Sequence, residues 1–68
     1  MPVRTRLHVM MALRGVRGTD LAERVGLTQA NLSKLKTGKV KAIRFSTLAA
    51  LCRELECQPG DLLEYVDG

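Results

Sequence analysis

Apolar residues recur along most of this chain at intervals of three and four residues, the spacing that gathers side chains on one face of an α-helix. Glycines follow the first three of these segments, and a glycine in the left-handed conformation commonly ends a helix. Residues 39–44 have no helical period and are predicted to form a loop. The pattern therefore predicts an all-α fold of five short helices, which cover about residues 4–14, 19–25, 29–36 and 47–55 and a last segment that begins at residue 59.

Several residues at the expected helix starts are suited to those positions. Thr28 and Ser46 can cap the third and fourth helices, because each offers a side-chain oxygen to the first turn. Pro59 suits the first turn of the fifth helix. Asp61 and Glu64 would lie early in that helix, where the helix dipole favours negative charge.

The N-terminal end of the chain admits a second interpretation. Val3, Thr5 and Leu7 alternate with arginines, as residues do in a short strand. Such a strand would need a partner, and Leu63 and Tyr65 near the C-terminus are suitably placed for one. Both the helix and the strand remain open at this point.

The length and composition limit what this chain can be. With 68 residues it has room for a single domain, and a chain of this size buries only about 60% of its unfolded surface. It contains one Phe, one Tyr and no Trp, so a pocket lined with aromatic rings is not available. This composition argues against most enzymes that act on small molecules, and we expect no small-molecule substrate.

Basic residues are concentrated in the first two-thirds of the chain. Residues 1–44 carry ten basic and two acidic side chains, a balance of +8, whereas residues 45–68 carry one basic and five acidic side chains, a balance of −4. The densest part is TQANLSKLKTGKVKAIRF, residues 28–45, with five basic side chains and no acidic one. Solubility alone does not require such segregation. The distribution indicates an anionic partner for the first part of the chain.

Metal, redox and catalytic chemistry find little support in the sequence. Cys52 and Cys57 are not at the usual spacing of zinc ligands, and His8 lies far from them along the chain. We expect two reduced, partly buried thiols, with a disulfide as the open alternative, and a surface position for His8. The string KTGK lacks the preceding strand and glycine-rich loop of a phosphate-binding lysine motif. We therefore expect no metal, no cofactor and no enzymatic activity.

Targeting and membrane signals are absent from the sequence. The N-terminus has no apolar run of the kind found in signal peptides, and no stretch approaches the length of apolar sequence that spans a bilayer. We expect a soluble, cytoplasmic protein that does not bind a membrane.

The second and third predicted helices have the residue types of a helix-turn-helix. Ala22 is small where the third helix must cross closely, Gly26 supplies a positive φ in the turn, and Leu32 anchors the third helix in the core. Any one of these residues is a weak signal, whereas the full set is a fairly strong one. The remaining inward positions hold apolar residues, namely Leu21, Val25, Leu27 and Leu35.

The segment GTDLAERVGLTQANLSKLKTG resembles the helix-turn-helix of the Cro and phage-repressor (XRE-type) regulators, and the following GKVKAIRFSTLAALCRELECQPGDLL is also similar to that family. The resemblance extends from Leu7 to about Leu63. It implies a five-helix, lambda-repressor-like domain that binds double-stranded DNA, usually as a dimeric repressor. One position departs from the family, which often has Gln at the start of the second helix, where it braces the recognition helix and contacts a phosphate. This chain has Gly18 there, so the contact is lost or is supplied by Arg17 or Thr19.

The resemblance also implies which residues read the DNA. The base-contacting positions of the family fall on Gln29, Ala30, Asn31 and Lys34. Gln29 can bond adenine, Lys34 can reach guanine, and Ala30 can meet a thymine methyl group. As an alternative, these residues are ordinary solvated positions on a helix surface.

A second set of positions is expected beside the DNA backbone. Side chains and helix-start N–H groups there would contact phosphates. Arg44 matches a position that in some phage repressors lies against the minor groove near the dyad, where an arginine favours a narrow groove. The set contains Thr28, Ser33, Thr37, Lys39, Lys41 and Arg44.

Two other functions remain open from the sequence. The same fold can serve as a protein-interaction module such as an antitoxin or an adaptor, with the acidic C-terminal third as the partner surface. A non-specific nucleic-acid binder is less compatible with the scarcity of aromatic side chains for stacking. A homodimer would use the fourth helix, the fifth helix or the chain ends, where Leu63, Tyr65 and Val66 are candidate contacts.

Overall fold

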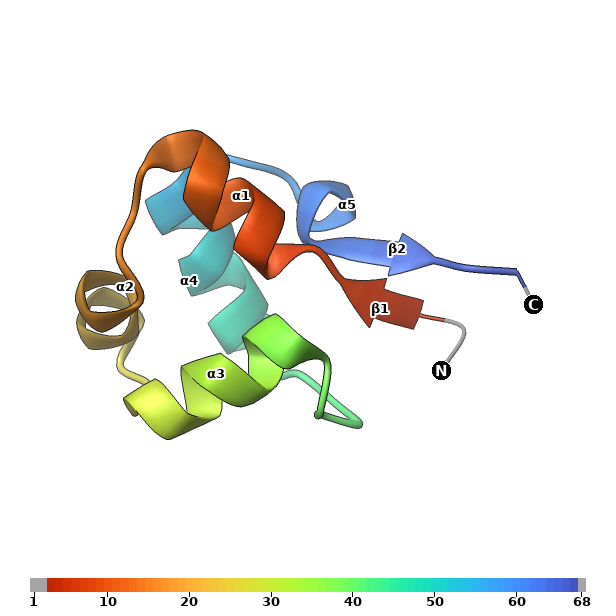
Figure 1. Cartoon of the computed structure of the whole chain (residues 1–68), viewed down its shortest axis with the longest axis horizontal. Helices are drawn as coiled ribbons and strands as arrows, with labels where there is room; N and C mark the ends of the chain where they lie inside the picture. The colour runs from red at the N-terminus through yellow and green to blue at the C-terminus, as the bar shows by residue number, and fades with distance from the viewer. Residues whose placement is uncertain (1–2, 68) are drawn as a thin grey trace.

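The computed structural model describes residues 3–67, in which five helices are accompanied by a two-stranded antiparallel ribbon (Figure 1). The predicted all-α helix-turn-helix fold is confirmed, with this ribbon as an addition. Met1, expected only as the start residue, lies outside the described residues. The elements are β1 (Val3–Thr5), α1 (Leu7–Arg14), α2 (Gly18–Val25), α3 (Gln29–Thr37), α4 (Phe45–Leu55), α5 (Pro59–Leu62) and β2 (Leu63–Tyr65).

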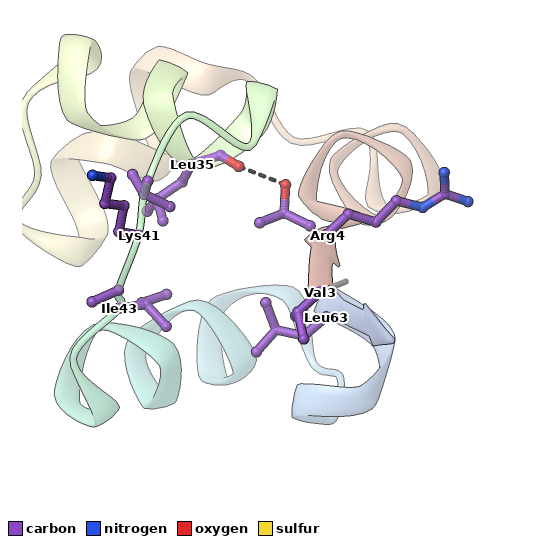
Figure 2. A pocket seen from close by; sticks show the side chains of 9 residues that line it. Val3, Arg4, Leu35, Lys41, Ile43 and Leu63 are labelled. Atoms are coloured by element: carbon purple, nitrogen blue, oxygen red, sulfur yellow. Dashed lines mark hydrogen bonds between the residues drawn. The ribbon is translucent and has the colours of Figure 1, made fainter. Parts of the chain in front are cut away.

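The ribbon joins the two ends of the chain. Val3 pairs with Tyr65 and Thr5 with Leu63, so the predicted strand alternative is confirmed and the helix from residue 4 is wrong. Helix α1 begins only at Leu7, because the backbone of residues 3–5 bonds across the ribbon instead of along a helix. The Thr5 hydroxyl also donates a hydrogen bond of 2.6 Å to the carbonyl oxygen of Leu35, drawn as the dashed line in Figure 2. The ribbon is thereby attached to the C-terminal half of α3.

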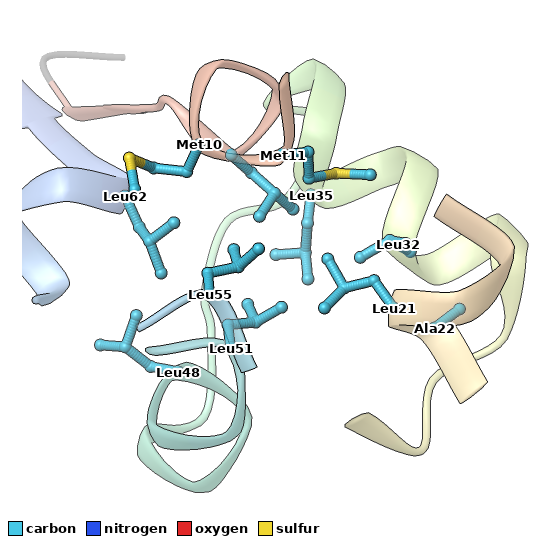
Figure 3. Close-up of a cluster of buried hydrophobic side chains, with 11 residues drawn as sticks. Met10, Met11, Leu21, Ala22, Leu32, Leu35, Leu48, Leu51, Leu55 and Leu62 are labelled. Atoms are coloured by element: carbon cyan, nitrogen blue, oxygen red, sulfur yellow. The ribbon is translucent and has the colours of Figure 1, made fainter. Parts of the chain in front are cut away.

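Leucines from all five helices meet in a buried cluster (Figure 3). Leu21 of α2 and Leu51 and Leu55 of α4 are essentially inaccessible to solvent. Val25 and Leu27 are half-buried against this cluster. The fully buried members are Leu7, Met10, Met11, Leu21, Ala22, Leu32, Leu35, Leu48, Leu51, Leu55 and Leu62.

Helices α2 and α3 end by the same local device. Gly26 and Gly38 both have a φ of +75°, which glycine adopts without steric cost. The next residue then donates its N–H back into the helix, from Leu27 to the Ala22 carbonyl and from Lys39 to the Lys34 carbonyl, at 2.9 Å each. These bonds satisfy carbonyl groups that the helix end would otherwise leave open. The predicted glycine stops are therefore confirmed.

Two predicted details of the C-terminal third are wrong. Ser46 is not the N-cap of α4, because the helix already begins at Phe45 with Arg44 at the cap position, where the Arg44 carbonyl accepts the Leu48 N–H at 2.9 Å. Glu64 is not in α5 but in β2, where its carboxylate accepts a hydrogen bond of 3.0 Å from Arg4 Nε across the ribbon. Pro59 and Asp61 do lie in the first turn of α5 as expected.

The C-terminal end of α4 is held by the end of α1. The Arg14 guanidinium donates to the carbonyl oxygens of Leu55 at 2.8 Å and Glu56 at 3.1 Å. This helix ends without a glycine, because Glu56 itself takes the left-handed conformation with a φ of 51°. The bonds from Arg14 give hydrogen-bond partners to carbonyl groups at this helix end.

Across the described part of the chain, no helix is both long enough and apolar enough to cross a bilayer.

Candidate nucleic-acid interface

Helix α3 turns a narrow side toward the core and the rest of its surface toward solvent. Leu32 and Leu35 are only 2% and 7% exposed. The other residues of the helix are all exposed, including the four predicted base-contacting residues. The two leucines therefore anchor α3, and the packing of the core places no demand on the exposed side chains. These are Gln29, Ala30, Asn31, Ser33, Lys34, Lys36 and Thr37.

The start of α3 is capped by Thr28, as predicted. Its Oγ1 atom accepts the Asn31 N–H at 3.1 Å. A hydroxyl group has one proton to donate as well as lone pairs, so the O–H of Thr28 is not used by the cap. The exposed first turn of α3 therefore offers N–H groups, a hydroxyl donor and the positive end of the helix dipole at one place.

Thr37 is less suited to a phosphate contact than its position suggests. Its hydroxyl donates to the Ser33 carbonyl at 3.0 Å, with the Lys34 carbonyl at 3.4 Å. This bond uses the only proton of the hydroxyl, so donation to a phosphate would require the side chain to rotate.

The loop between α3 and α4 alternates between residues that face the protein and residues that face solvent. Val40 and Ile43 are half-buried against the core, whereas Lys39, Lys41 and Arg44 are exposed. The apolar pair thereby holds the loop close to the end of α3 and leaves its basic side chains at the surface.

The positive charge of this surface is not neutralised by neighbouring carboxylates. The salt bridges within residues 3–67 join Arg4 to Glu64 and Arg53 to Glu54, and neither involves α3 or the following loop. An uncompensated row of exposed bases creates a local potential that attracts polyanions. The five bases of this surface are Lys34, Lys36, Lys39, Lys41 and Arg44.

A hollow of about 510 Å³ lies between the start of α2 and the exposed side of α3. Arg17, Thr19 and Gln29 are among the residues that line it. Gly18 is also in the lining, and a Cβ atom added there would stand 3.7 Å from Met11 Cε and 3.9 Å from Leu32 Cδ2, ordinary contact distances. A side chain at position 18 would therefore not be excluded at its Cβ atom, and the bracing side chain that the family often has there is absent because this chain has glycine.

Sequence reasoning missed two features close to this surface. Thr5 bonds the Leu35 carbonyl near the end of α3, a contact between residues 30 positions apart that only the folded ribbon reveals. Phe45 at the start of α4 is 86% exposed, directly after the basic loop. The sequence could have drawn attention to Phe45, because it is the one phenylalanine in a chain with a single tyrosine and no tryptophan.

The cysteines stand apart from this surface, at the end of α4. Both are free and half-buried, as predicted, and the Cys57 N–H donates to the Cys52 carbonyl at 3.0 Å. Burial, followed by the neighbouring Cys52 thiol, raises the pKa of Cys57, which favours the protonated form of that thiol. His8 is exposed, and within residues 3–67 no three His, Cys, Asp or Glu side chains gather in a way that could hold a metal ion.

Comparison with known proteins identifies the family. The sequence profile of the Cro/C1-type HTH DNA-binding domain matches residues 6–68 of this chain. The chain belongs to this family of helix-turn-helix transcriptional regulators. It is 60% identical over 65 residues to YozG of Bacillus subtilis (strain 168), an uncharacterised HTH-type transcriptional regulator, with 96% of this chain and 77% of YozG aligned.

Solved structures agree with this assignment. The crystal structure of the transcriptional regulator VanUg has a TM-score of 0.76 at 26% identity, covering 98% of this chain and 88% of VanUg. A crystal structure of a candidate DNA-binding protein from Bacteroides fragilis has a TM-score of 0.82 and covers 91% of this chain and 98% of its own. At 21% identity this second structure supports the fold alone.

Proposed function

We propose that residues 1–68 form a single DNA-binding domain that represses transcription in a bacterial cytoplasm by binding operator DNA as a homodimer, with α3 in the major groove. The observation that carries this proposal is the design of α3, whose two buried leucines leave an exposed surface without a single acidic side chain. Membership of the Cro/C1-type family supports DNA as the partner. A bound dimer would repress by excluding other proteins from the same stretch of DNA.

The exposed side of α3 supplies suitable base-reading groups. The carboxamide of Gln29 or Asn31 can donate a hydrogen bond to adenine N7 and accept one from the adenine N6 amino group. The ammonium group of Lys34 can donate to guanine O6 and N7. The methyl group of Ala30 can make an apolar contact with the methyl group of a thymine. All four side chains are exposed without a rearrangement of the core.

The backbone of the DNA would be held by the two ends of α3 and by the loop. Thr28 and the first-turn N–H groups offer donors at one end, and Lys39 and Lys41 offer charge at the other. Arg44 then lies beside the minor groove, and Ser33 supports the contacts along the helix. Thr37 contributes only after its hydroxyl leaves the Ser33 carbonyl.

Selection from a random duplex DNA pool, followed by affinity measurements across a salt series, tests this proposal. We expect a palindromic winner bound far more tightly than scrambled DNA, because a twofold dimer presents two recognition helices about 34–36 Å apart. The logarithm of affinity should fall with the logarithm of salt concentration by about 0.9 per phosphate neutralised. The absence of both a selected sequence and salt-dependent binding would contradict the proposal and would indicate that the domain recognises a protein, as an antitoxin or adaptor does.

A further inference from the structure

An apolar groove of about 280 Å³ separates the ribbon from the loop between α3 and α4 (Figure 2). The lining comes from segments at both ends of the chain and from its middle, and six of its nine residues are aliphatic. No side chain of the described residues fills this space. The residues that matter here are Val3, Thr5, Leu35, Val40, Ile43 and Leu63.

Two exposed apolar side chains stand at the outer end of the ribbon. Val3 and Tyr65 are directly paired across the strands, so their side chains point to the same face of the ribbon, the face that Leu63 presents to the groove. They are 44% and 69% exposed. A large exposed tyrosine beside an open aliphatic groove is unfavourable in an isolated molecule and favours association.

The groove lies on the side of the molecule at which a DNA-bound dimer would place its symmetry axis. Figure 1 shows the ribbon at one end of the 34 Å long axis and α2 at the other, with the loop between α3 and α4 on the ribbon's side of the molecule. The loop lines the groove through Val40 and Ile43, and the same loop carries Arg44, the residue proposed to lie near the dyad. A twofold axis at this end would bring two grooves together.

The charges at this end are complementary to each other. Exposed Lys41 is on the rim of the groove, whereas exposed Asp67 lies two residues after the end of β2. A twofold axis that set the acidic end of each copy against the basic rim of the other would pair these charges. This arrangement offsets the repulsion between two basic loops and disfavours an acidic partner protein at the same place.

We propose that this groove is the homodimer interface, in which Tyr65 of each copy packs into the groove of the other and Asp67 lies beside the other copy's Lys41. A twofold contact of this kind is self-complementary, because each copy supplies both the inserted side chain and the groove. The inference rests on the proposed function for its symmetry axis. It also gives the Thr5 hydrogen bond to Leu35 a role, since that bond fixes α3 relative to the interface and so sets the spacing of the two recognition helices.

Sedimentation equilibrium of Tyr65→Glu against Leu13→Glu tests this interface. Leu13 is a matched control, because it is 68% exposed and lies on α1, outside the groove lining. We expect wild type and Leu13→Glu to form dimers of the 7.5 kDa chain. Tyr65→Glu should dimerise about tenfold more weakly or worse, the loss typical of an aromatic side chain at an interface centre. Circular dichroism should show the same helix content in all three proteins.

The chain also carries its own reporter of this contact. Tyr65 is the sole tyrosine and there is no tryptophan, so intrinsic fluorescence on dilution follows the environment of this one side chain. We expect the emission intensity to change over the concentration range in which the mass falls to that of a monomer. Emission that stays constant while the mass falls would overturn the placement of Tyr65 in the interface.

DNA binding separates failure of the interface from failure of the proposed function. We expect Tyr65→Glu to bind a single half-site as tightly as wild type does and to lose the extra affinity for the palindrome. A Tyr65→Glu protein that matches wild type in mass and on the palindrome would overturn the interface and leave DNA binding intact. Wild-type monomers at all concentrations, with a small molecule copurifying in the groove, would overturn it as well. Wild-type dimers that fail to bind any DNA would instead contradict the proposed function.

Discussion

Helices α2 and α3 are the two halves of one motif, and they differ mainly in how they begin. Helix α3 starts with the hydroxyl of Thr28 bonded to the Asn31 N–H, whereas α2 starts at Gly18 with no side-chain cap. Both helices bury two residues in the core, Leu21 and Ala22 from α2 and Leu32 and Leu35 from α3, so α2 has packing but no side-chain cap. The comparison teaches that α2 depends on the core for its place, and that α3 carries part of its own stability in its cap.

The exposed surfaces of the two helices also differ in their charge. Helix α2 mixes acidic Asp20 and Glu23 with basic Arg24, as an ordinary solvated surface does. Helix α3 carries Lys34 and Lys36 and no acidic side chain. This difference supports the proposal that α3, and not α2, faces the negatively charged DNA.

The largest effect is expected where α2 depends on the core. Leu21→Ala removes a side chain with 0% exposure and should lower the free energy of unfolding by about 2–5 kcal/mol through lost burial and a residual cavity. Ser33→Ala, on the exposed side of α3, should change it by less than about 0.5 kcal/mol. Urea unfolding followed by circular dichroism measures both. Equal losses would show that α2 does not rely on its buried face.

The next effect concerns DNA reading by α3. Lys34→Ala should relax the preference at one base position by about 1–3 kcal/mol, because the contact is directed to a base edge. Lys36→Ala, two residues further along the same helix, should weaken binding to all sequences slightly and evenly. Competition binding with single-base operator variants gives both profiles. A uniform loss for Lys34→Ala across all sequences would refute its role in base reading.

A smaller effect is expected at the cap of α3. Thr28→Ala should destabilise the protein by about 1 kcal/mol, because the Asn31 N–H loses its partner at the helix start. Thr28→Ser retains the oxygen and should recover most of that loss. Thermal unfolding reports the stability, and hydrogen exchange at the Asn31 amide should quicken only in the alanine variant. Unchanged exchange in Thr28→Ala would mean that the cap does not hold the first turn.

The smallest effect is expected at the start of α2, where replacing Gly18 should stabilise the helix. Gly18→Ala should raise the free energy of unfolding by at most about 1 kcal/mol, since a Cβ at Gly18 meets its neighbours at ordinary distances and alanine favours a helix. Gly18→Gln should in addition reach the hollow beside Gln29 and strengthen DNA binding. Gly26→Ala is the contrast, because its φ of +75° makes the same change destabilising. A Gly18→Gln protein with lower DNA affinity would show that the open hollow itself serves binding.

Much of the proposed DNA surface could be predicted because it follows from neighbouring residues. The spacing of Leu32 and Leu35 defines the buried side of α3 and therefore also the exposed one. The glycine stops and the Thr28 cap are interactions within one helical turn, so local sequence contains both partners. Which base each exposed side chain meets is a property of the complex with DNA and stays a prediction.

Errors arose where a local preference competed with a distant contact. Ser46 has the better capping side chain, yet α4 begins at Phe45 with the Arg44 carbonyl bonded to Leu48 N–H, and the preceding Ile43 packs against the core. Glu64 suits a helix dipole by its charge, yet the polypeptide there pairs with β1 and its carboxylate bonds Arg4.

The sequence by itself determined the helices, their glycine ends, the face that each buries and the basic surface of α3, because these depend on residues within a few positions of one another. The sequence offered the ribbon only as one of two alternatives, and the tertiary structure decided between them. The tertiary structure alone decided the bond from Thr5 to Leu35, the support of α4 by Arg14 and the groove between the ribbon and the loop. The ribbon and the bonds made by Thr5 and Arg14 join segments that lie 30 or more positions apart along the chain. Such contacts form only after the whole core has placed both segments, so a local pattern can suggest a strand but does not settle what it contacts.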